Sequence, residues 1–182
     1  DRVLKYLNGN RGLGIILSAE RGKIIEEAYI DAAYGVHADA KSHTGTVITL
    51  GRGPIFVKSS GQKLVSKSST EAELIALSDS LSNIIWLRQF LQHQGYDMGP
   101  AVVYQDNKST MALANKGRST SERTRHINIR YFFVKDRIES GDIVIKYKQT
   151  GEMIADILTK PLQGSLFRRL RSLLLNWKTE DK

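Results

Sequence analysis

The sequence contains no cysteine, which excludes disulfide bonds and thiolate zinc sites. No apolar run approaches the roughly 20 residues that span a bilayer, and no segment has the pattern of a signal peptide. The four histidines, at positions 37, 43, 93 and 126, show no close pair at metal-ligand spacing. We therefore expect a soluble, intracellular protein without a membrane partner. Any bound metal ion should have oxygen ligands, which favours magnesium, manganese or calcium.

The size and charge of the chain favour one globular domain with a polyanionic partner. Its 182 residues suit a single domain, with short appendages at either end. Apolar residues make up 41% and charged residues 25%, as in ordinary folded domains. The net charge of +8 and the isoelectric point near 9.7 favour nucleic acid over a membrane surface as the partner.

Hydrophobic patterns predict an α/β fold with one mixed sheet and helices packed on it. Five segments of the first half have the pattern of antiparallel strands: 14–18, 23–31, 45–50, 55–58 and 62–66. The second half contains a long helix ending near Gly95, a strand at 101–105, a helix at 109–115, an amphipathic helix from 123 to a stop at Gly141, a strand at 142–148, and helices beginning near 150 and 166.

The stretch from Ser68 to Leu77 begins the long helix and carries two carboxylates in its first turn. Thr70 is the predicted N-cap, and Leu74 and later apolar residues recur at helical spacing. Glu71 and Glu73 flank this apolar stripe from opposite sides. Glu73 could also close a capping box with Thr70, so the carboxylates have a purely structural explanation as well.

Four carboxylates stand where strands or helices end or begin. Asp31 and Asp106 follow apolar strands, whereas Glu73 and Asp156 lie near helix starts. If the two strands are parallel neighbours, the four side chains can meet outside the sheet edge. A cluster of this kind repels itself unless it binds divalent cations, and two such ions support phosphoryl displacement by a nuclease. Taken singly, each acid is equally explained by turn or capping chemistry.

Five motifs in this order resemble the ribonuclease H domain of copia-type LTR retrotransposon polyproteins. They are YIDAAYG at 29–35, SSTEAELIAL at 68–77, VYQDN at 103–107, RTRHINIRY at 123–131 and ADILTKPL at 155–162. The resemblance implies a ribonuclease H-like fold: a five-stranded mixed sheet, its first three strands antiparallel, with helices on both faces. It also implies cleavage of RNA in RNA·DNA hybrids with two Mg²⁺ ions, for which Mn²⁺ is a possible substitute.

Carried over residue by residue, the resemblance makes Asp31, Glu73, Asp106 and Asp156 the catalytic, metal-binding acids. Glu71 is the rival of Glu73. The chain departs from the family at two places: Ala33 replaces a second aspartate common in copia-type members, and residues 149–155 lack the loop histidine of cellular and retroviral ribonucleases H. His126 could replace that histidine, although a lone histidine on a helix more often packs or contacts phosphate.

The expected nucleic-acid contacts are basic residues, foremost Lys108, Arg123, Arg125 and Arg130, with Lys58, Lys63 and Lys67 as further candidates. The products should carry 5′-phosphate and 3′-hydroxyl ends. The resemblance predicts the end of an upstream connection or reverse transcriptase region at 1–22, the ribonuclease H domain at 23–162, and a C-terminal amphipathic helix and tail at 163–182.

The upstream reverse transcriptase of the same polyprotein is the expected protein partner, in a cytoplasmic virus-like particle or in the nucleus. Two alternatives remain open at this point. One is a non-catalytic, structural or nucleic-acid-binding domain with the same fold. The other is a nuclease or transposase with this fold that acts on DNA.

Overall fold

A five-stranded mixed sheet forms the centre of the molecule, in a computed structural model that describes residues 1–18, 24–116 and 125–177. Its strands are β1 (Glu26–Ala33), β2 (His43–Leu50), β3 (Pro54–Gly61), β4 (Ala101–Gln105) and β5 (Ile143–Tyr147). The order across the sheet is β3-β2-β1-β4-β5; β1, β2 and β3 pair antiparallel, and β4 pairs parallel with both β1 and β5. The predicted sheet is therefore confirmed, including its three antiparallel strands.

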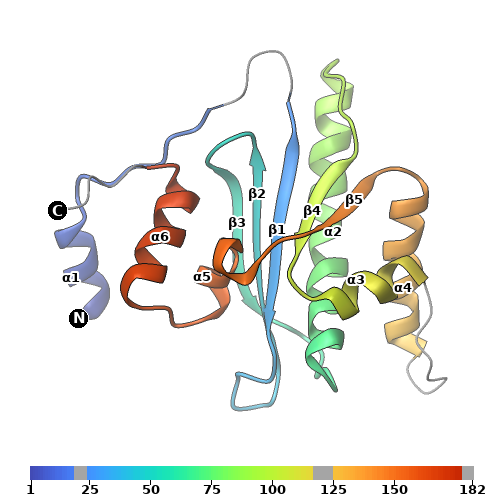
Figure 1. Cartoon of the computed structure of the whole chain (residues 1–182), viewed down its shortest axis with the longest axis horizontal. Coiled ribbons are helices and arrows are strands. Elements are labelled where there is room, and N and C mark those ends of the chain that lie inside the picture. The colour runs from blue at the N-terminus through green and yellow to red at the C-terminus, as the bar shows by residue number, and fades with distance from the viewer. Residues whose placement is uncertain (19–23, 117–124, 178–182) are drawn as a thin grey trace.

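Helices cover both faces of this sheet (Figure 1). One side carries α2 (Ser69–His93), α3 (Lys108–Lys116) and α4 (Arg125–Glu139). The other side carries the short α5 (Asp156–Thr159), preceded by the 3-10 turn η1 (Thr150–Glu152), and α6 (Gly164–Leu175). The first helix, α1 (Arg2–Gly9), lies beyond α6. Among the described helices, none is both long and apolar enough to cross a membrane.

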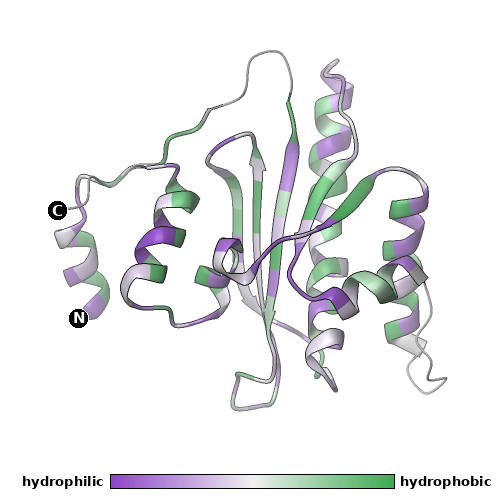
Figure 2. Ribbon diagram, in the orientation of Figure 1, coloured by the Kyte–Doolittle hydropathy of each residue, from purple (hydrophilic) through white to green (hydrophobic). Residues whose placement is uncertain are grey.

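Two hydrophobic clusters fix these layers. The larger one joins Ile30 and Ile48 of the sheet to Leu77 and Leu81 of α2 and to Val134 of α4, all almost fully buried. Figure 2 shows green and purple residues alternating along α4, and the apolar residues Ile127, Tyr131 and Val134 of this helix lie in the larger cluster. The smaller cluster centres on Val47, Ile154 and Leu170 and holds α5 and α6 against the opposite face of the sheet.

The long helix α2 begins two residues earlier than the sequence indicated. Ser68, not Thr70, is the N-cap, and its hydroxyl accepts a hydrogen bond from the Glu71 amide at 3.2 Å. Glu71 in turn accepts from the Lys67 amide at 2.7 Å. The prediction of Thr70 as cap was wrong because Ser68 has the same capping chemistry and an extended backbone. Glu71 therefore bonds to the backbone at the start of the helix, and the Glu73 carboxylate is available to bond residues outside α2.

Three further predicted elements differ from the structure. Residues 14–18 form no strand: Ser18 makes a single antiparallel bridge with Arg52, and the Ile16 amide donates to the Leu175 carbonyl at the end of α6. Residues 62–66 form none either, because the Gln62 side chain ties this segment to Thr44 and the Ala72 carbonyl. The helix predicted from Thr150 is divided into η1 and α5. The division of the chain at residues 22 and 162 remains a prediction.

Candidate metal centre

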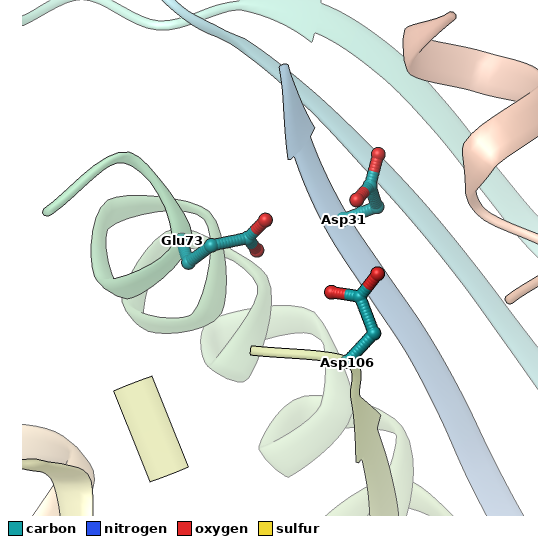
Figure 3. Close-up of side chains that lie close together, drawn as sticks. All are labelled: Asp31, Glu73 and Asp106. Carbon is teal, nitrogen blue, oxygen red and sulfur yellow. The ribbon is translucent and has the colours of Figure 1, made fainter. Parts of the chain in front are cut away.

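Three of the four predicted acids converge at one edge of the sheet. Asp31 lies near the carboxyl end of β1, Asp106 directly follows β4, and Glu73 projects from the first turns of α2. One carboxylate oxygen from each lies within 4.8 Å of the other two (Figure 3). The convergence follows from topology, because β1 and β4 are parallel neighbours whose carboxyl ends share an edge.

Glu73 is held in place by groups from two strands. Its oxygens accept from the Ala32 amide at 3.2 Å and from the Gln105 side-chain amide at 3.3 Å. The side chain is only 5% exposed. Burial, followed by the charges of Asp31 and Asp106, raises the pKa of the Glu73 carboxyl to about 8. The rival Glu71 remains at the helix start, where it bonds the Lys67 amide.

Asp156, the fourth predicted acid, lies outside this group of three but beside Asp31, because α5 lies directly against β2. Gly45 is paired with Asp31 across the β1–β2 ladder. A Cβ atom added at Gly45 would lie 2.8 Å from the Thr159 methyl group and 2.9 Å from the Ala155 carbonyl oxygen. Glycine is therefore required there for this approach. The approach places Asp156, the first residue of α5, beside Asp31.

Lys160 connects Asp156 to Asp31. Its ammonium Nζ lies 2.9 Å from one Asp156 oxygen and 3.3 Å from one Asp31 oxygen, and the Thr159 hydroxyl donates to the other Asp31 oxygen. Burial raises the pKa of Asp156 to about 6, although the Lys160 hydrogen bond acts in the opposite direction. The two aspartates are 1% and 2% exposed. Lys160 thus supplies a positive charge that these buried carboxylates need in the absence of a metal ion.

We expect Lys160→Met to destabilise the metal-free protein by about 2 kcal/mol, because it leaves two buried carboxylates without their cation. The loss should be smaller than for a fully buried pair, since 35% of the Lys160 side chain is exposed. Thermal unfolding in EDTA measures the effect, and added Mg²⁺ should restore part of the loss.

Lys135→Met is the matched control for this experiment. Lys135 also pairs with an acid four residues away, Glu139 at 3.4 Å, and its side chain is 34% exposed, but that acid is 66% exposed. Its replacement should change stability by less than about 0.5 kcal/mol. Equal effects of the two substitutions would show that Lys160 has no special place in the cluster.

Two nearby arrangements were not predicted from the sequence. Thr150, in the segment 149–155 that contains no histidine, donates from its hydroxyl to Asp106 at 2.9 Å. His37 and His43 lie 2.9 Å apart through their ring nitrogens, and His43 also bonds Ser59 at 2.8 Å. The six-residue spacing of the histidines gave no signal, because the hairpin that joins β1 to β2 brings them together.

The structure describes some of the residues that are predicted to contact nucleic acid. Lys108 is exposed at the start of α3, two residues after Asp106. Arg130 forms an ion pair with Asp79 and borders a groove of about 930 Å³, beside Lys58 and Lys63. Arg123 and the side chains of Arg125 and His126 lie outside the described residues. The roles of all of these residues remain predictions.

The donor set fits a hard divalent cation. Asp31, Glu73 and Asp106 offer only oxygen, the donor that Mg²⁺ and Mn²⁺ prefer. Burial raises the pKa of Glu73, and the neighbouring charges of Asp31 and Asp106 raise it further. A bound cation would remove this repulsion, so the carboxylates are suited to a metal site.

Known proteins with similar sequences are retrotransposon polyproteins. The chain is 33% identical over 173 residues to the retrovirus-related Pol polyprotein from transposon TNT 1-94 of Nicotiana tabacum, and 34% identical over 174 residues to that from transposon RE1 of Arabidopsis thaliana. Each alignment covers 94% of this chain but only 13% and 12% of the respective polyprotein. The chain therefore corresponds to about an eighth of these relatives. No family model matches it.

Solved structures with a similar fold include ribonucleases H. LC11-RNase H1, isolated from compost, superposes with a TM-score of 0.57 at 17% identity, over 75% of this chain and 93% of that one. The same enzyme in complex with an RNA/DNA hybrid gives 0.52 at 16% identity, over 73% and 92%. At these identities the likeness establishes the fold alone. The chain thus has the ribonuclease H fold and is homologous to one segment of retrotransposon Pol polyproteins.

Proposed function

We propose that this chain is an endoribonuclease that cleaves the RNA strand of RNA·DNA hybrids during reverse transcription of a retrotransposon. The observation that carries the proposal is the convergence of Asp31, Glu73 and Asp106 at the shared edge of β1 and β4. Homology to Pol polyproteins supports the retrotransposon setting. One structural neighbour is a ribonuclease H in complex with an RNA/DNA hybrid, which supports this class of substrate.

Two Mg²⁺ ions, or Mn²⁺ in their place, are the proposed cofactors. Asp31, Glu73 and Asp106 would hold them together with Asp156, which Lys160 connects to Asp31. Such ions activate water and stabilise the attacking and leaving oxygens of phosphoryl transfer, here giving 5′-phosphate and 3′-hydroxyl ends.

The contribution of the protein itself is to hold the four acids in one arrangement before the substrate arrives. The Ala32 amide and Gln105 fix Glu73, Thr150 fixes Asp106, and Thr159 fixes Asp31. Each of these donors occupies one carboxylate oxygen and limits rotation of the side chain. Lys160 balances the charge of Asp31 and Asp156 and must move or share its partners when a cation binds.

Basic residues would hold the phosphates around this centre. Lys108 stands beside Asp106, and Lys58, Lys63 and Arg130 border the groove of about 930 Å³ between β3, α2 and α4. Serine and threonine hydroxyls line the same groove, which suits sugar and phosphate contacts. Arg123 and Arg125 are proposed to extend this surface. Contacts to 2′-hydroxyl groups would select RNA, and phosphate contacts would make binding independent of sequence.

The proposed protein partner is the reverse transcriptase region of the same polyprotein. Two observations support it: the matched relatives are about eight times longer than this chain, and α1 exposes apolar side chains. Val3, Leu4 and Leu7 are 56–65% exposed on that helix. An apolar face of this kind is covered when a neighbouring domain packs against it.

A cleavage assay tests the proposed function. Labelled RNA·DNA hybrid, RNA duplex and DNA duplex of one sequence are incubated with the chain in Mg²⁺, in Mn²⁺ and in EDTA. We expect cleavage of the hybrid alone, only with metal, and with 5′-phosphate on the products. Cleavage of the DNA duplex would instead indicate a DNA nuclease. Tight binding of hybrid without cleavage in either metal would indicate a non-catalytic docking domain.

A further inference from the structure

A second cavity, of about 500 Å³, lies between the sheet and α6 on the face that carries Asp31. Tyr29 and Thr49 of the sheet line one side of it. The turn from β2 to β3 at Arg52, the segment after β5 and the end of α6 with Trp177 complete the wall. A volume of this size is within the range of pockets that hold one small ligand, about 300–1,000 Å³.

The cavity is contiguous with the acidic cluster along the strands. Tyr29 precedes Asp31 by two residues and Tyr104 precedes Asp106 by two, so each pair shares one face of the sheet. Tyr29 and Tyr104 are register partners, and their ring centroids are 4.8 Å apart. Two residues of strand span about 7 Å. A nucleic-acid strand at the carboxylates would therefore meet the tyrosines within one or two nucleotides.

The residues around the cavity combine aromatic rings with cations. The Lys148 ammonium lies 4.7 Å from the Tyr104 ring centre and 5.9 Å from that of Tyr29. Arg52, Arg169 and the Trp177 indole line the cavity beside it. Aromatic rings that stack on bases, next to cations that hold the backbone, are the usual features of single-strand binding sites.

Two carboxylates also line the cavity, but neither blocks a phosphate. Glu27 accepts a hydrogen bond from the Tyr104 hydroxyl at 2.8 Å. Glu152 lies 3.9 Å from Lys148 and 3.8 Å from Arg169, distances too long for hydrogen bonds. A phosphate can therefore compete for both cations. Three cations against two carboxylates leave the cavity with a net positive charge.

Thr49 adds a buried hydroxyl, unpaired within the part of the chain that the structure describes, to the wall of the cavity. This residue is 5% exposed and lines the cavity, and its hydroxyl oxygen is buried without a hydrogen-bond partner among the described residues. Buried hydroxyls are normally paired. A ribose hydroxyl or a phosphate oxygen in the cavity would supply the partner.

We propose that this cavity binds an unpaired nucleotide of a single strand that continues from the hybrid at the acidic cluster. The base lies against Trp177 and Tyr29, and the phosphate is held by Lys148, Arg169 and Arg52. This inference rests on the proposed function, because it takes the strand at the carboxylates to be nucleic acid. A paired duplex does not enter, since its bases have no free faces to stack.

Tryptophan fluorescence tests the proposal, because the chain contains only Trp86 and Trp177. Trp86 is 64% exposed on α2, on the other face of the sheet, so Trp86→Phe leaves Trp177 as the sole reporter. We titrate this variant with a short oligouridylate, with uridine monophosphate and with inorganic phosphate. The oligouridylate should quench Trp177, and Lys148→Met with Arg169→Ala should weaken its binding at least about five-fold. Lys135→Met should not.

Absence of quenching by the oligouridylate, or equal affinity for inorganic phosphate, would overturn the nucleotide site. The matched variant Trp177→Phe, which reports through Trp86 alone, should give no comparable signal, and an equal signal would place binding elsewhere. Melting temperatures of all variants verify that they are folded. Hybrid cleavage by the Trp86→Phe protein is measured separately. A cavity that does not bind nucleotide is then distinguished from a chain that does not cleave hybrid, which is the failure of the proposed function.

Discussion

Replacement of Asp106 by asparagine is expected to stabilise the protein in EDTA and to abolish its activity in Mg²⁺. The melting temperature should rise by about 3–6 °C without metal, corresponding to about 1–2 kcal/mol at this chain length. Hybrid cleavage should fall more than about 100-fold, because removal of groups that merely orient a metal ligand already costs 10- to 100-fold.

The stabilisation follows from crowding of like charges. Asp106 lies with Asp31 and Glu73 in a group whose oxygens are within 4.8 Å, and its charge contributes to the raised pKa of Glu73. Above about pH 8, where Glu73 is ionised, like charges at such distances repel by a few kcal/mol at an intermediate effective dielectric constant, so the melting temperatures are compared at pH 8.5. Asparagine has the same shape, removes the charge, and still accepts the hydrogen bond from Thr150. The repulsion decreases while the packing is retained.

Calorimetry in EDTA and in Mg²⁺ separates the two effects. Wild type should gain stability with added Mg²⁺, as expected for a ligand that binds only the folded state, whereas Asp106→Asn should gain little. Asp97→Asn serves as the control, because Asp97 is exposed outside the cluster. A lower melting temperature of Asp106→Asn in EDTA, or retained cleavage, would argue against a crowded metal site.

The convergence of acids at strand ends could be predicted from the sequence, because the carboxyl ends of neighbouring parallel strands lie at the same edge of a sheet. Asp31 and Asp106 both end apolar runs, and parallel pairing of β1 with β4 brings them together. The choice between Glu71 and Glu73 could not be made by spacing, since both lie in one helical turn. It depends on Ser68 being the cap, which uses Glu71 and leaves Glu73 to face the Ala32 amide.

Contacts between distant segments had no signal in the sequence. The pairing of Lys160 with Asp31 joins residues 129 positions apart and depends on how closely α5 lies over Gly45. Residues 150–158 have the apolar spacing of one helix, yet the chain forms a 3-10 turn and then α5. Burial of Met153, Ile154 and Ala155 against the sheet overrides the local helical preference.

A buried acid outside the candidate site should make stability depend on pH. Glu26 begins β1, is 2% exposed, and has both carboxylate oxygens without a hydrogen-bond partner among the described residues. Burial raises the pKa of this carboxyl to about 8, although the charge of Arg88 acts in the opposite direction. Arg88 already donates to Asp142 at 2.9 Å and to the Gly99 carbonyl at 3.1 Å. It therefore compensates Glu26 only in part.

We expect Glu26→Gln to stabilise the protein by about 2–3 kcal/mol at pH 8.5 and hardly at all near pH 4.5. The folded state keeps the Glu26 proton up to a pKa of about 8, whereas the unfolded chain releases it near 4.5. Between these values the folded state binds more protons, so the contribution of Glu26 to the free energy of unfolding falls as pH rises and levels off above about pH 8. The difference between these two pKa values of Glu26 corresponds to about 5 kcal/mol at 1.36 kcal/mol per pKa unit. This is an upper limit, because relaxation of the protein interior reduces the effect.

The measurement is the difference between the free energies of unfolding of wild type and Glu26→Gln, from denaturant titrations in EDTA across this pH range. The difference isolates Glu26, because the raised pKa of Glu73 affects both proteins in the same direction. Glu139→Gln, at a side chain that is 66% exposed, should show no such dependence. A gain that is the same at every pH would mean that the amide improves packing, and a loss at pH 8.5 would mean that the Glu26 carboxylate has a partner after all.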